Sequence, residues 1–230
     1  MKIEIWSDIV CPFCYIGKRR LEAALATFPH RDQVEIQWKS FELDPQYQPQ
    51  AGRSIHASLA AKKGISEAQA RQMGNQMTQM AAELGLQYDF DKAVPANTFL
   101  AHQVLHLASK AGLNNEAKER LFRAYYTEGQ DLNDLETLVR LATEIGLDAA
   151  ETRTALDAGT YANAVRYDEY QAQQINVRGV PYFVFEDKYA VSGAQPTELF
   201  AEVLDTVWRE ANPLVAVGAE GTACGPEGCD

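Results

Sequence analysis

The sequence predicts an α/β fold into which a large all-helical segment is inserted. Two observations predict this fold class. Apolar and polar residues alternate with the period of a strand near both ends of the chain, in residues 2–7, 34–38 and 182–191. Between these strands, residues 54–175 carry apolar positions at helical spacing. A chain of 230 residues, 46% of them apolar, is long enough to bury a core without disulfides or metal ions.

The first unit of the chain is a strand, a helix and a second strand. The strand at residues 2–7 precedes a helix expected at residues 11–28, and Pro29 predicts where that helix ends. The second strand follows at residues 34–38. This order is typical of two parallel strands joined by a right-handed crossover.

A loop rich in Pro, Gln and Gly, residues 43–52, separates this unit from the helical segment. We therefore assign residues 44–160 to an inserted helical domain. Residues 1–43 and 176–211 form one discontinuous domain, and residues 161–175 are a connecting helix. The other helices expected in the segment span residues 54–62, 66–85, 97–111, 115–128, 134–145 and 148–157.

Strand character returns at residues 182–185 and 189–191, on either side of a turn at residues 186–187. Residues 197–210 are expected to form the closing helix. Residues 212–230 contain several glycines and no apolar periodicity, which predicts a mobile C-terminal tail.

The charge of the chain excludes two classes of partner. With 21 basic and 32 acidic residues the net charge is −11, so nucleic acids and anionic membrane surfaces are repelled. The sequence shows neither the apolar segment of a secretory signal nor the roughly 18 apolar residues of a membrane span. We therefore expect a cytoplasmic protein with no nucleic-acid or membrane partner.

The four cysteines form two close pairs at opposite ends of the chain, Cys11 with Cys14 and Cys224 with Cys229. Disulfides in a reducing cytosol are usually catalytic or sensing. Cys11 and Cys14 begin a helix, so their side chains share one face and reach disulfide distance after a modest adjustment. Unpaired backbone N–H groups and the helix dipole favour a thiolate there. We expect Cys11 to be the exposed nucleophile of low pKa and Cys14 to be the resolving thiol.

The two residues between the cysteines fit a redox pair. Pro12 suits the first helical turn because its missing N–H would have no partner there. Phe13 offers a thiolate neither charge nor a hydrogen bond. The alternatives are half of a zinc site, completed by the distant second pair, and two inert thiols.

A proline at the mouth of the third strand completes the pattern. Pro181 in NVRGVPYFVF has a plain interpretation, a strand-start proline without an N–H to pair. Together with IWSDIVCPFCYIGKRRLE, WKSFELDP and NTFLAHQVLHLA, however, this segment resembles the DsbA-like disulfide oxidoreductases, in particular their FrnE-type branch. The resemblance covers residues 1–210 and implies a thioredoxin fold with a helical domain inserted.

The resemblance also implies how the site is built. It implies that the Val180-Pro181 bond is cis and lies against the cysteines, and that Val180 and Pro181 position the substrate together with Pro12 and Phe13. Phe13 between the cysteines predicts a reduction potential below that of DsbA, about −120 mV.

Several further residues are secondary candidates. Asp8 either relays a proton to Cys14 or caps the turn before Cys11. The resemblance places Asn97, Thr98 and His102 in the wall of the cleft. The spacing of His102 and His106 also occurs in metal motifs, but flank positions beside the apolar stripe are favoured. Helical spacing also separates Met73, Met77 and Met80, and this pattern predicts that their side chains pack in the core or at an interface.

The leading hypothesis is a protein thiol–disulfide oxidoreductase or isomerase that needs no dissociable cofactor or metal. Its expected partners are disulfide-containing or unfolded proteins and a thiol reductant, glutathione or a thioredoxin-type system. One alternative is a glutathione-dependent transferase or an enzyme similar to 2-hydroxychromene-2-carboxylate isomerase. The other is a metal-binding or chaperone-like module. For Cys224 and Cys229 an accessory redox pair is favoured over metal capture and a passive tail.

Overall fold

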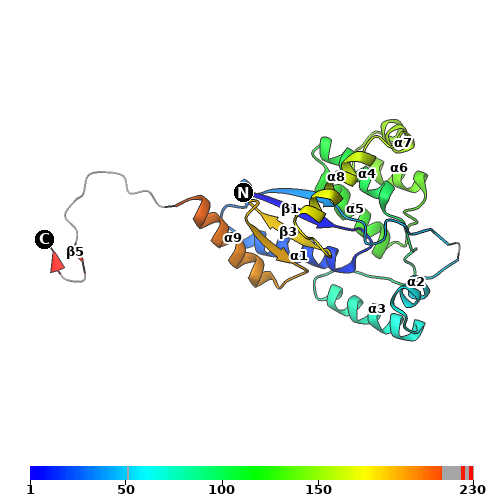
Figure 1. Ribbon diagram of the computed structural model, residues 1–230, viewed down its shortest axis with the longest axis horizontal. Helices are drawn as coiled ribbons and strands as arrows, with labels where there is room; N and C mark the ends of the chain where they lie inside the picture. Colours follow the sequence, from blue (N-terminus) through cyan, green and yellow to red (C-terminus); the bar gives the residue numbers. More distant parts are fainter. Residues whose placement is uncertain (51, 214–223, 226–227, 230) are drawn as a thin grey trace.

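The structure, a computed structural model, describes residues 1–50, 52–213, 224–225 and 228–229. A four-stranded sheet with the order β2-β1-β3-β4 lies at its centre (Figure 1). β1 is parallel to β2 and antiparallel to β3, which is antiparallel to β4. The strands are β1 (Lys2–Ser7), β2 (Glu35–Ser40), β3 (Tyr182–Phe185) and β4 (Tyr189–Ser192).

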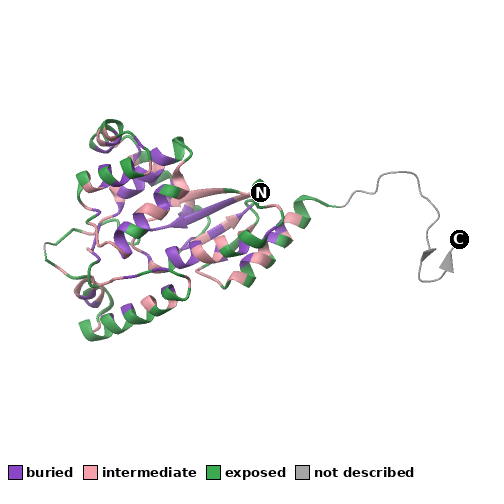
Figure 2. Cartoon of the chain, turned by 180° about the vertical axis from the view of Figure 1, so that it is seen from behind, coloured by how far each residue is buried: buried purple, intermediate pink, exposed green. Residues whose placement is uncertain are grey.

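Alternating side chains of the central strand β1 face two different sets of helices. Ile3 and Ile5 are buried in one cluster with residues of α1 (Pro12–Thr27) and α9 (Thr197–Ala211). Trp6 lies on the other face, and its Nε1–H donates to the Asp168 carbonyl oxygen at 2.9 Å. Figure 2 shows this strand buried along its length.

Seven helices of the described chain lie between β2 and β3, so the expected α/β frame with a helical insertion is confirmed. The domain boundaries assigned above stay a prediction. A short 3-10 helix, Arg31–Gln33, precedes β2. The inserted helices are α2 (Ile55–Lys63), α3 (Glu67–Ala82), α4 (Phe99–Lys110), α5 (Asn114–Tyr126), α6 (Leu135–Glu144), α7 (Ala149–Asp157) and α8 (Ala162–Gln174).

One predicted helix end was wrong by several residues. The helix expected over residues 66–85 begins after a capping box of Ser66 and Gln69, but it ends at Ala82. Gly85 has a φ of 74°, and the Leu86 N–H donates to the Ala81 carbonyl oxygen at 3.0 Å. A glycine in the left-handed region closes the helix here, because that bond turns the chain away from the helix axis.

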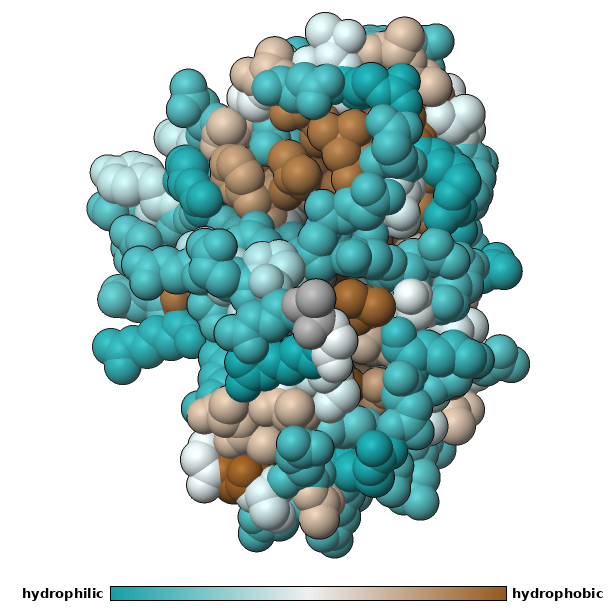
Figure 3. Space-filling view, turned by 90° about the vertical axis from the view of Figure 1, so that its right-hand side faces the viewer, coloured by the Kyte–Doolittle hydropathy of each residue, from teal (hydrophilic) through white to brown (hydrophobic). Residues whose placement is uncertain are grey.

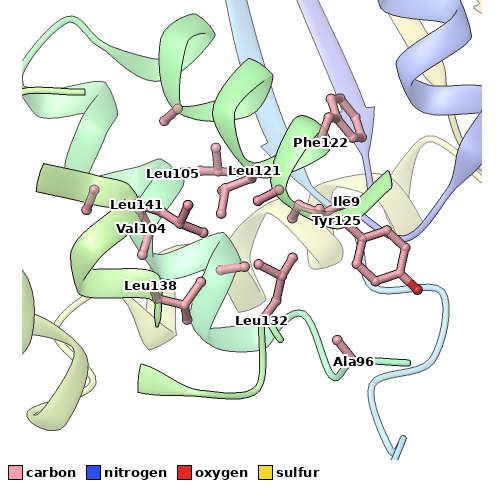
Figure 4. Close-up of a cluster of buried hydrophobic side chains, with 14 of the residues drawn as sticks. Ile9, Ala96, Val104, Leu105, Leu121, Phe122, Tyr125, Leu132, Leu138 and Leu141 are labelled. Carbon is pink, nitrogen blue, oxygen red and sulfur yellow. The ribbon is translucent and has the colours of Figure 1, made fainter. Parts of the chain in front are cut away.

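The main hydrophobic cluster joins the helical insertion to the first helix of the frame. It contains Ile9, Cys11, Cys14 and Tyr15 together with buried residues of α4, α5 and α6. Figure 4 shows Ile9 next to the aromatic side chains of α5, with the leucines of the helices behind it. The region around the first cysteine pair is therefore built by both parts of the chain.

Part of the predicted C-terminal tail is described. Cys224–Gly225 (β5) and Gly228–Cys229 (β6) pair as antiparallel strands, which places Cys224 opposite Cys229 in the backbone register. The mobility expected of residues 212–230 falls mostly on positions outside the described residues.

The surface of the helical end is largely hydrophilic. Figure 3 shows this end, with an apolar hollow in its upper half, the half that holds α4, α6 and α7 in Figure 1. In the part of the chain that the structure describes, no helix combines the length and the hydropathy required to cross a membrane.

The cluster predicts where the fold is most sensitive to truncation. Leu121 of α5 is 1% exposed and lies in its interior (Figure 4). Leu121→Ala should lower the free energy of unfolding by about 2–5 kcal/mol in urea denaturation, since lost burial and a cavity add. Leu199→Ala, at an exposed position of α9, should change it by only about 0.5 kcal/mol. Equal losses in the two variants would contradict this assignment of the core.

Candidate active site

The first cysteine pair lies where β1 ends and α1 begins. Cys11 has an extended backbone, with φ −92° and ψ 111°, and is the N-cap of α1, and Pro12 is the first helical residue. The Cys11 N–H donates to the Asp8 carbonyl oxygen at 3.2 Å, and the Cys14 N–H donates to the Cys11 carbonyl oxygen at 3.0 Å. Both side chains are free thiols. The turn and the helix start predicted from the sequence are thus present, with Pro12 where its missing N–H costs least.

A loop 169 residues further along the chain contacts the first thiol. Cys11 Sγ donates a hydrogen bond to the Val180 carbonyl oxygen at 3.3 Å. The Val180-Pro181 peptide bond is cis, as the resemblance implied. The Pro181 carbonyl oxygen accepts from the Gly193 N–H at 2.8 Å, which fixes the loop to the end of β4. The structure therefore brings Cys11, Val180 and Pro181 together.

The loop can lie this close to α1 because residue 17 has no side chain. A Cβ atom on Gly17 would lie 3.1 Å from both Pro181 Cγ and Phe183 Cζ. Ordinary contacts of a Cβ atom are longer than about 3.4 Å, and neither ring can easily move away. Gly17, one turn after Cys14, thus permits the approach of helix and loop.

The expectation that Cys11 is exposed was wrong. Cys11 is 4% exposed and Cys14 1%, while Phe13 between them is 41% exposed. The cause is the packing of the insertion and the proline loop around the start of α1: the Tyr88 hydroxyl donates to the Pro12 carbonyl oxygen at 2.8 Å, and Val180 covers Cys11. The sequence does not show this cover because it comes from distant segments.

The low pKa expected for Cys11 is also corrected. The hydrogen bond with Cys14, burial and the repulsion of a Cys14 thiolate raise the pKa of the Cys11 thiol well above its usual range, although the Cys14 N–H lowers it. The two thiols are coupled, so one negative charge on the pair makes loss of the second proton harder. The reactive species of the reduced pair therefore carries one charge shared between two sulfurs.

Asp8 is wholly buried near this pair, and a main-chain N–H donates to its carboxylate. Its Oδ2 accepts from the Leu43 N–H at 2.8 Å. His102 Nε2 lies 3.4 Å from Oδ1, too poorly aligned for a hydrogen bond. Burial raises the pKa of Asp8, but His102, the Leu43 N–H and Thr98 together hold it below its usual range. The capping role expected for Asp8 is thus performed by its main-chain carbonyl, and proton relay to Cys14 stays a prediction.

His102 is 0% exposed, so the flank position predicted for it was wrong. α4 packs against α5, α6, α7 and α8, which leaves little of its surface free. Burial lowers the pKa of His102, and the Asp8 carboxylate only partly offsets this. A neutral imidazole therefore faces Asp8 near pH 7.

The other residues of NTFLAH differ in their positions. Thr98 is buried beside Asp8. Asn97 instead ties loops together: its Nδ2 donates to the Tyr47 carbonyl oxygen at 3.3 Å, and its Oδ1 accepts from the Phe99 N–H at 3.0 Å. These contacts give Asn97 a structural role at the start of α4.

Lys118, which the sequence patterns did not single out, lies in the same buried region. Lys118 of α5 is 0% exposed, and its Nζ donates to the Ser7 carbonyl oxygen at 3.3 Å. Nζ also lies 5.1 Å from the ring centroid of Phe122. Burial lowers the pKa of Lys118 to about 8, although nearby thiolates and Asp8 oppose this effect. A signal was available, since Lys118 shares the helical face of Leu121 and Phe122.

A separate cavity of 420 Å³ lies along β2, away from the cysteines. Its lining includes Lys39, His106 and Asp168. His106 Nε2 is 3.1 Å from Asp168 Oδ2, and Lys39 Nζ is 3.4 Å from Asp168 Oδ1. These groups satisfy one another, so the cavity adds no reactive group to the thiol site.

A redox-type cysteine pair at a helix start, opposite a proline loop and inside this α/β frame, defines a class of protein. The family of DSBA-like thioredoxin domains matches residues 2–205, and the chain belongs to this family.

Individual relatives agree with this assignment. The crystal structure of the probable DsbA oxidoreductase SCO1869 from Streptomyces coelicolor superposes with a TM-score of 0.87 at 43% identity, covering 100% of this chain and 98% of that one. The uncharacterized protein YwbO of Bacillus subtilis is 30% identical over 205 residues, 88% of this chain and 94% of YwbO. The cytosolic disulfide reductase DsbM from Pseudomonas aeruginosa shares the fold, with a TM-score of 0.60 at 20% identity over 91% of this chain and 100% of DsbM.

The approach of helix and loop can be tested at Gly17. Gly17→Ala should lower the free energy of unfolding by about 1–3 kcal/mol, because the added methyl group pushes against Pro181 and Phe183. It should also speed the alkylation of Cys11 by iodoacetamide, since the loop moves off the thiol. Gly74→Ala in α3, where a Cβ atom would meet His56 Cε1 at 3.3 Å and Phe90 Cδ2 at 3.5 Å, is the control for a tight helical glycine elsewhere and should leave the alkylation rate of Cys11 unchanged. Alkylation at the wild-type rate in Gly17→Ala would show that Gly17 does not hold the loop on Cys11.

The buried ammonium of Lys118 predicts a pH-dependent stability. Lys118→Met should raise the free energy of unfolding near pH 7 by about 1–4 kcal/mol, because an apolar side chain avoids the cost of a buried charge. The unfolded chain holds this proton up to the usual lysine pKa of 10.5, whereas the folded protein releases it near pH 8. The cost is therefore complete below pH 8 and disappears as the pH rises towards 10.5, so the two proteins should converge.

Urea denaturation at pH 7 and pH 10 measures this difference, with the exposed Lys63→Met as the control for loss of a surface charge. A gain as large at pH 10 as at pH 7 would rule out the charge as its cause.

Proposed function

We propose that the chain is a protein thiol–disulfide oxidoreductase with Cys11 as the nucleophile and Cys14 as the resolving thiol. The observation that carries this proposal is the position of Cys11 Sγ, 3.3 Å from the Val180 carbonyl oxygen at the start of α1. An extended substrate segment that pairs with the main chain at Val180 brings its disulfide to this sulfur. Pro181 and the exposed Phe13 border the same position and contact the substrate.

The reaction exchanges one disulfide for another. The Cys11 thiolate attacks one sulfur of the substrate disulfide, a mixed disulfide forms, and the other substrate sulfur leaves as a thiolate that takes up a proton. The Cys14 thiol then loses its proton and attacks Cys11 Sγ. The bond between Cys11 and the substrate breaks, the Cys11–Cys14 disulfide forms, and the substrate leaves reduced. Without the second attack, the mixed disulfide rearranges within the substrate, which is isomerisation.

The cycle requires a thiol reductant to return the Cys11–Cys14 disulfide to the dithiol. Glutathione or a thioredoxin-type protein supplies these two electrons, and we place the cycle in the cytoplasm, where such reductants are kept reduced. The cytosolic reductase DsbM, which shares the fold, is consistent with this location. In the second pair, Cys224 lies opposite Cys229 in the backbone register of β5 and β6, and we propose that it serves as an accessory redox pair.

A glutathione transferase or isomerase acting through a single thiol is the alternative to this cycle. It needs no resolving residue, whereas Cys14 here is buried within one helical turn of Cys11 and coupled to it. The dithiol arrangement therefore favours disulfide exchange.

The proposal predicts distinct results for each cysteine in an insulin reduction assay with glutathione. Cys11→Ser should lose all activity, because no nucleophile remains. Cys14→Ser should lose multiple turnover, by roughly 100-fold, and accumulate the Cys11 mixed disulfide, which mass spectrometry of the whole protein detects. The Cys224→Ser/Cys229→Ser double variant is the matched control and should keep most of the activity. Full activity of Cys14→Ser would instead favour the single-thiol alternative.

A further inference from the structure

The helical insertion places a buried positive charge against the end of β1, just before the turn that leads to Cys11. Lys118 of α5 is 0% exposed. Its Nζ lies 3.3 Å from the Ser7 carbonyl oxygen, and Ser7 precedes Asp8, whose own carbonyl oxygen caps Cys11. Nζ also lies over the Phe122 ring, which stacks on Tyr15, the neighbour of Cys14, with 4.7 Å between ring centroids. The ammonium thus lies between the end of β1 and the Phe122 ring of α5, and Phe122 links it to α1.

This charge has no carboxylate partner of its own. Within residues 1–50 and 52–213, no carboxylate oxygen lies within the 4.0 Å of a salt bridge to Lys118 Nζ. The nearby Lys18 differs, because it is paired with Glu22 at 2.5 Å and with Glu119 at 2.8 Å. The charged and titratable groups that act on Lys118 or are acted on by it are Asp8, Cys11, Cys14, Lys18 and His102.

We propose that Lys118 is a positioning residue for disulfide exchange, whose buried ammonium stabilises the thiolate of the Cys11–Cys14 pair and so raises its reduction potential. The inference rests on the function proposed above. Without Lys118, the Asp8 carboxylate is the charge that faces a thiolate in this buried region, and it opposes thiolate formation. The Lys118 ammonium and a thiolate of the pair attract each other, and this attraction raises the pKa of Lys118.

The effect reaches both half-reactions. In the dithiol protein the ammonium stabilises the single negative charge that the two sulfurs share. In the mixed disulfide it stabilises Cys14 when that thiol loses its proton to attack Cys11 Sγ. In the oxidised protein neither sulfur is charged, and this stabilisation is absent. Lys118 therefore favours the reduced pair over the disulfide.

The test measures the redox equilibrium with glutathione in full-length protein carrying Cys224→Ser and Cys229→Ser, so that only the first pair responds. Lys118→Met should increase the equilibrium constant for oxidation by glutathione disulfide about tenfold, which is a fall of about 30 mV in the potential. The thiolate absorbance at 240 nm should move its midpoint to higher pH by about one pH unit. Lys118→Arg keeps the charge and should stay near the wild-type value in both measurements.

Leu121→Ala is the control for loosening of α5, because it removes packing from the same helix without removing charge. It should shift neither the equilibrium nor the thiolate midpoint. The inference would be overturned if Lys118→Met left the equilibrium constant and the thiolate midpoint unchanged, or if Leu121→Ala shifted them by the same amount. If Lys118→Arg does not fold, the comparison of Lys118→Met with Leu121→Ala in the same two measurements decides between loss of charge and loss of packing. Failure of the wild type itself to exchange with glutathione would reject the proposed function instead.

Discussion

The site depends on one packing contact, the approach of the α1 backbone at Gly17 to the ring of Pro181. A Cβ atom at Gly17 would lie 3.1 Å from that ring, which is tighter than an ordinary contact, so glycine favours the close approach. Cys11 is the N-cap of the same helix, and its Sγ donates a hydrogen bond of 3.3 Å to the Val180 carbonyl oxygen of the same loop. A purely steric fit between two distant segments thus fixes the geometry of the thiol and of the backbone that faces it.

The second constraint is electrostatic, since two opposite charges are buried beneath the same turn. Asp8 is held by the Leu43 N–H, and Lys118 by the Ser7 carbonyl oxygen. Each charge alone would cost several kcal/mol to bury. They are contributed by different parts of the chain, Asp8 by the segment after β1 and Lys118 by α5 of the insertion. The insertion is therefore part of the thiol site as well as a cover for it.

Local features could be predicted from the sequence, and features that depend on packing between helices could not. Strand and helix periods gave the order of elements, and the family resemblance carried by CPFC and Pro181 implied which residues meet at Cys11. The burial of Cys11 and His102 depends on which helices pack over them, and a periodicity holds no such information. Lys118 combines both cases. Its place on the apolar face of α5 can be read from the sequence, but its contact with Ser7, 111 residues away, cannot.

The reduction potential of the pair follows from opposing contributions. Phe13 contributes no charge or hydrogen bond to a thiolate, and Asp8 repels one. The start of α1 attracts a thiolate through its unpaired N–H groups, and no acidic residue in its first turn weakens that field. Lys118 adds a full charge, but its pKa near 8 means that this contribution fades in mildly alkaline solution. Oxidation of the dithiol releases two protons, so the pair becomes easier to oxidise as the pH rises, and the loss of its cationic partner adds to this change.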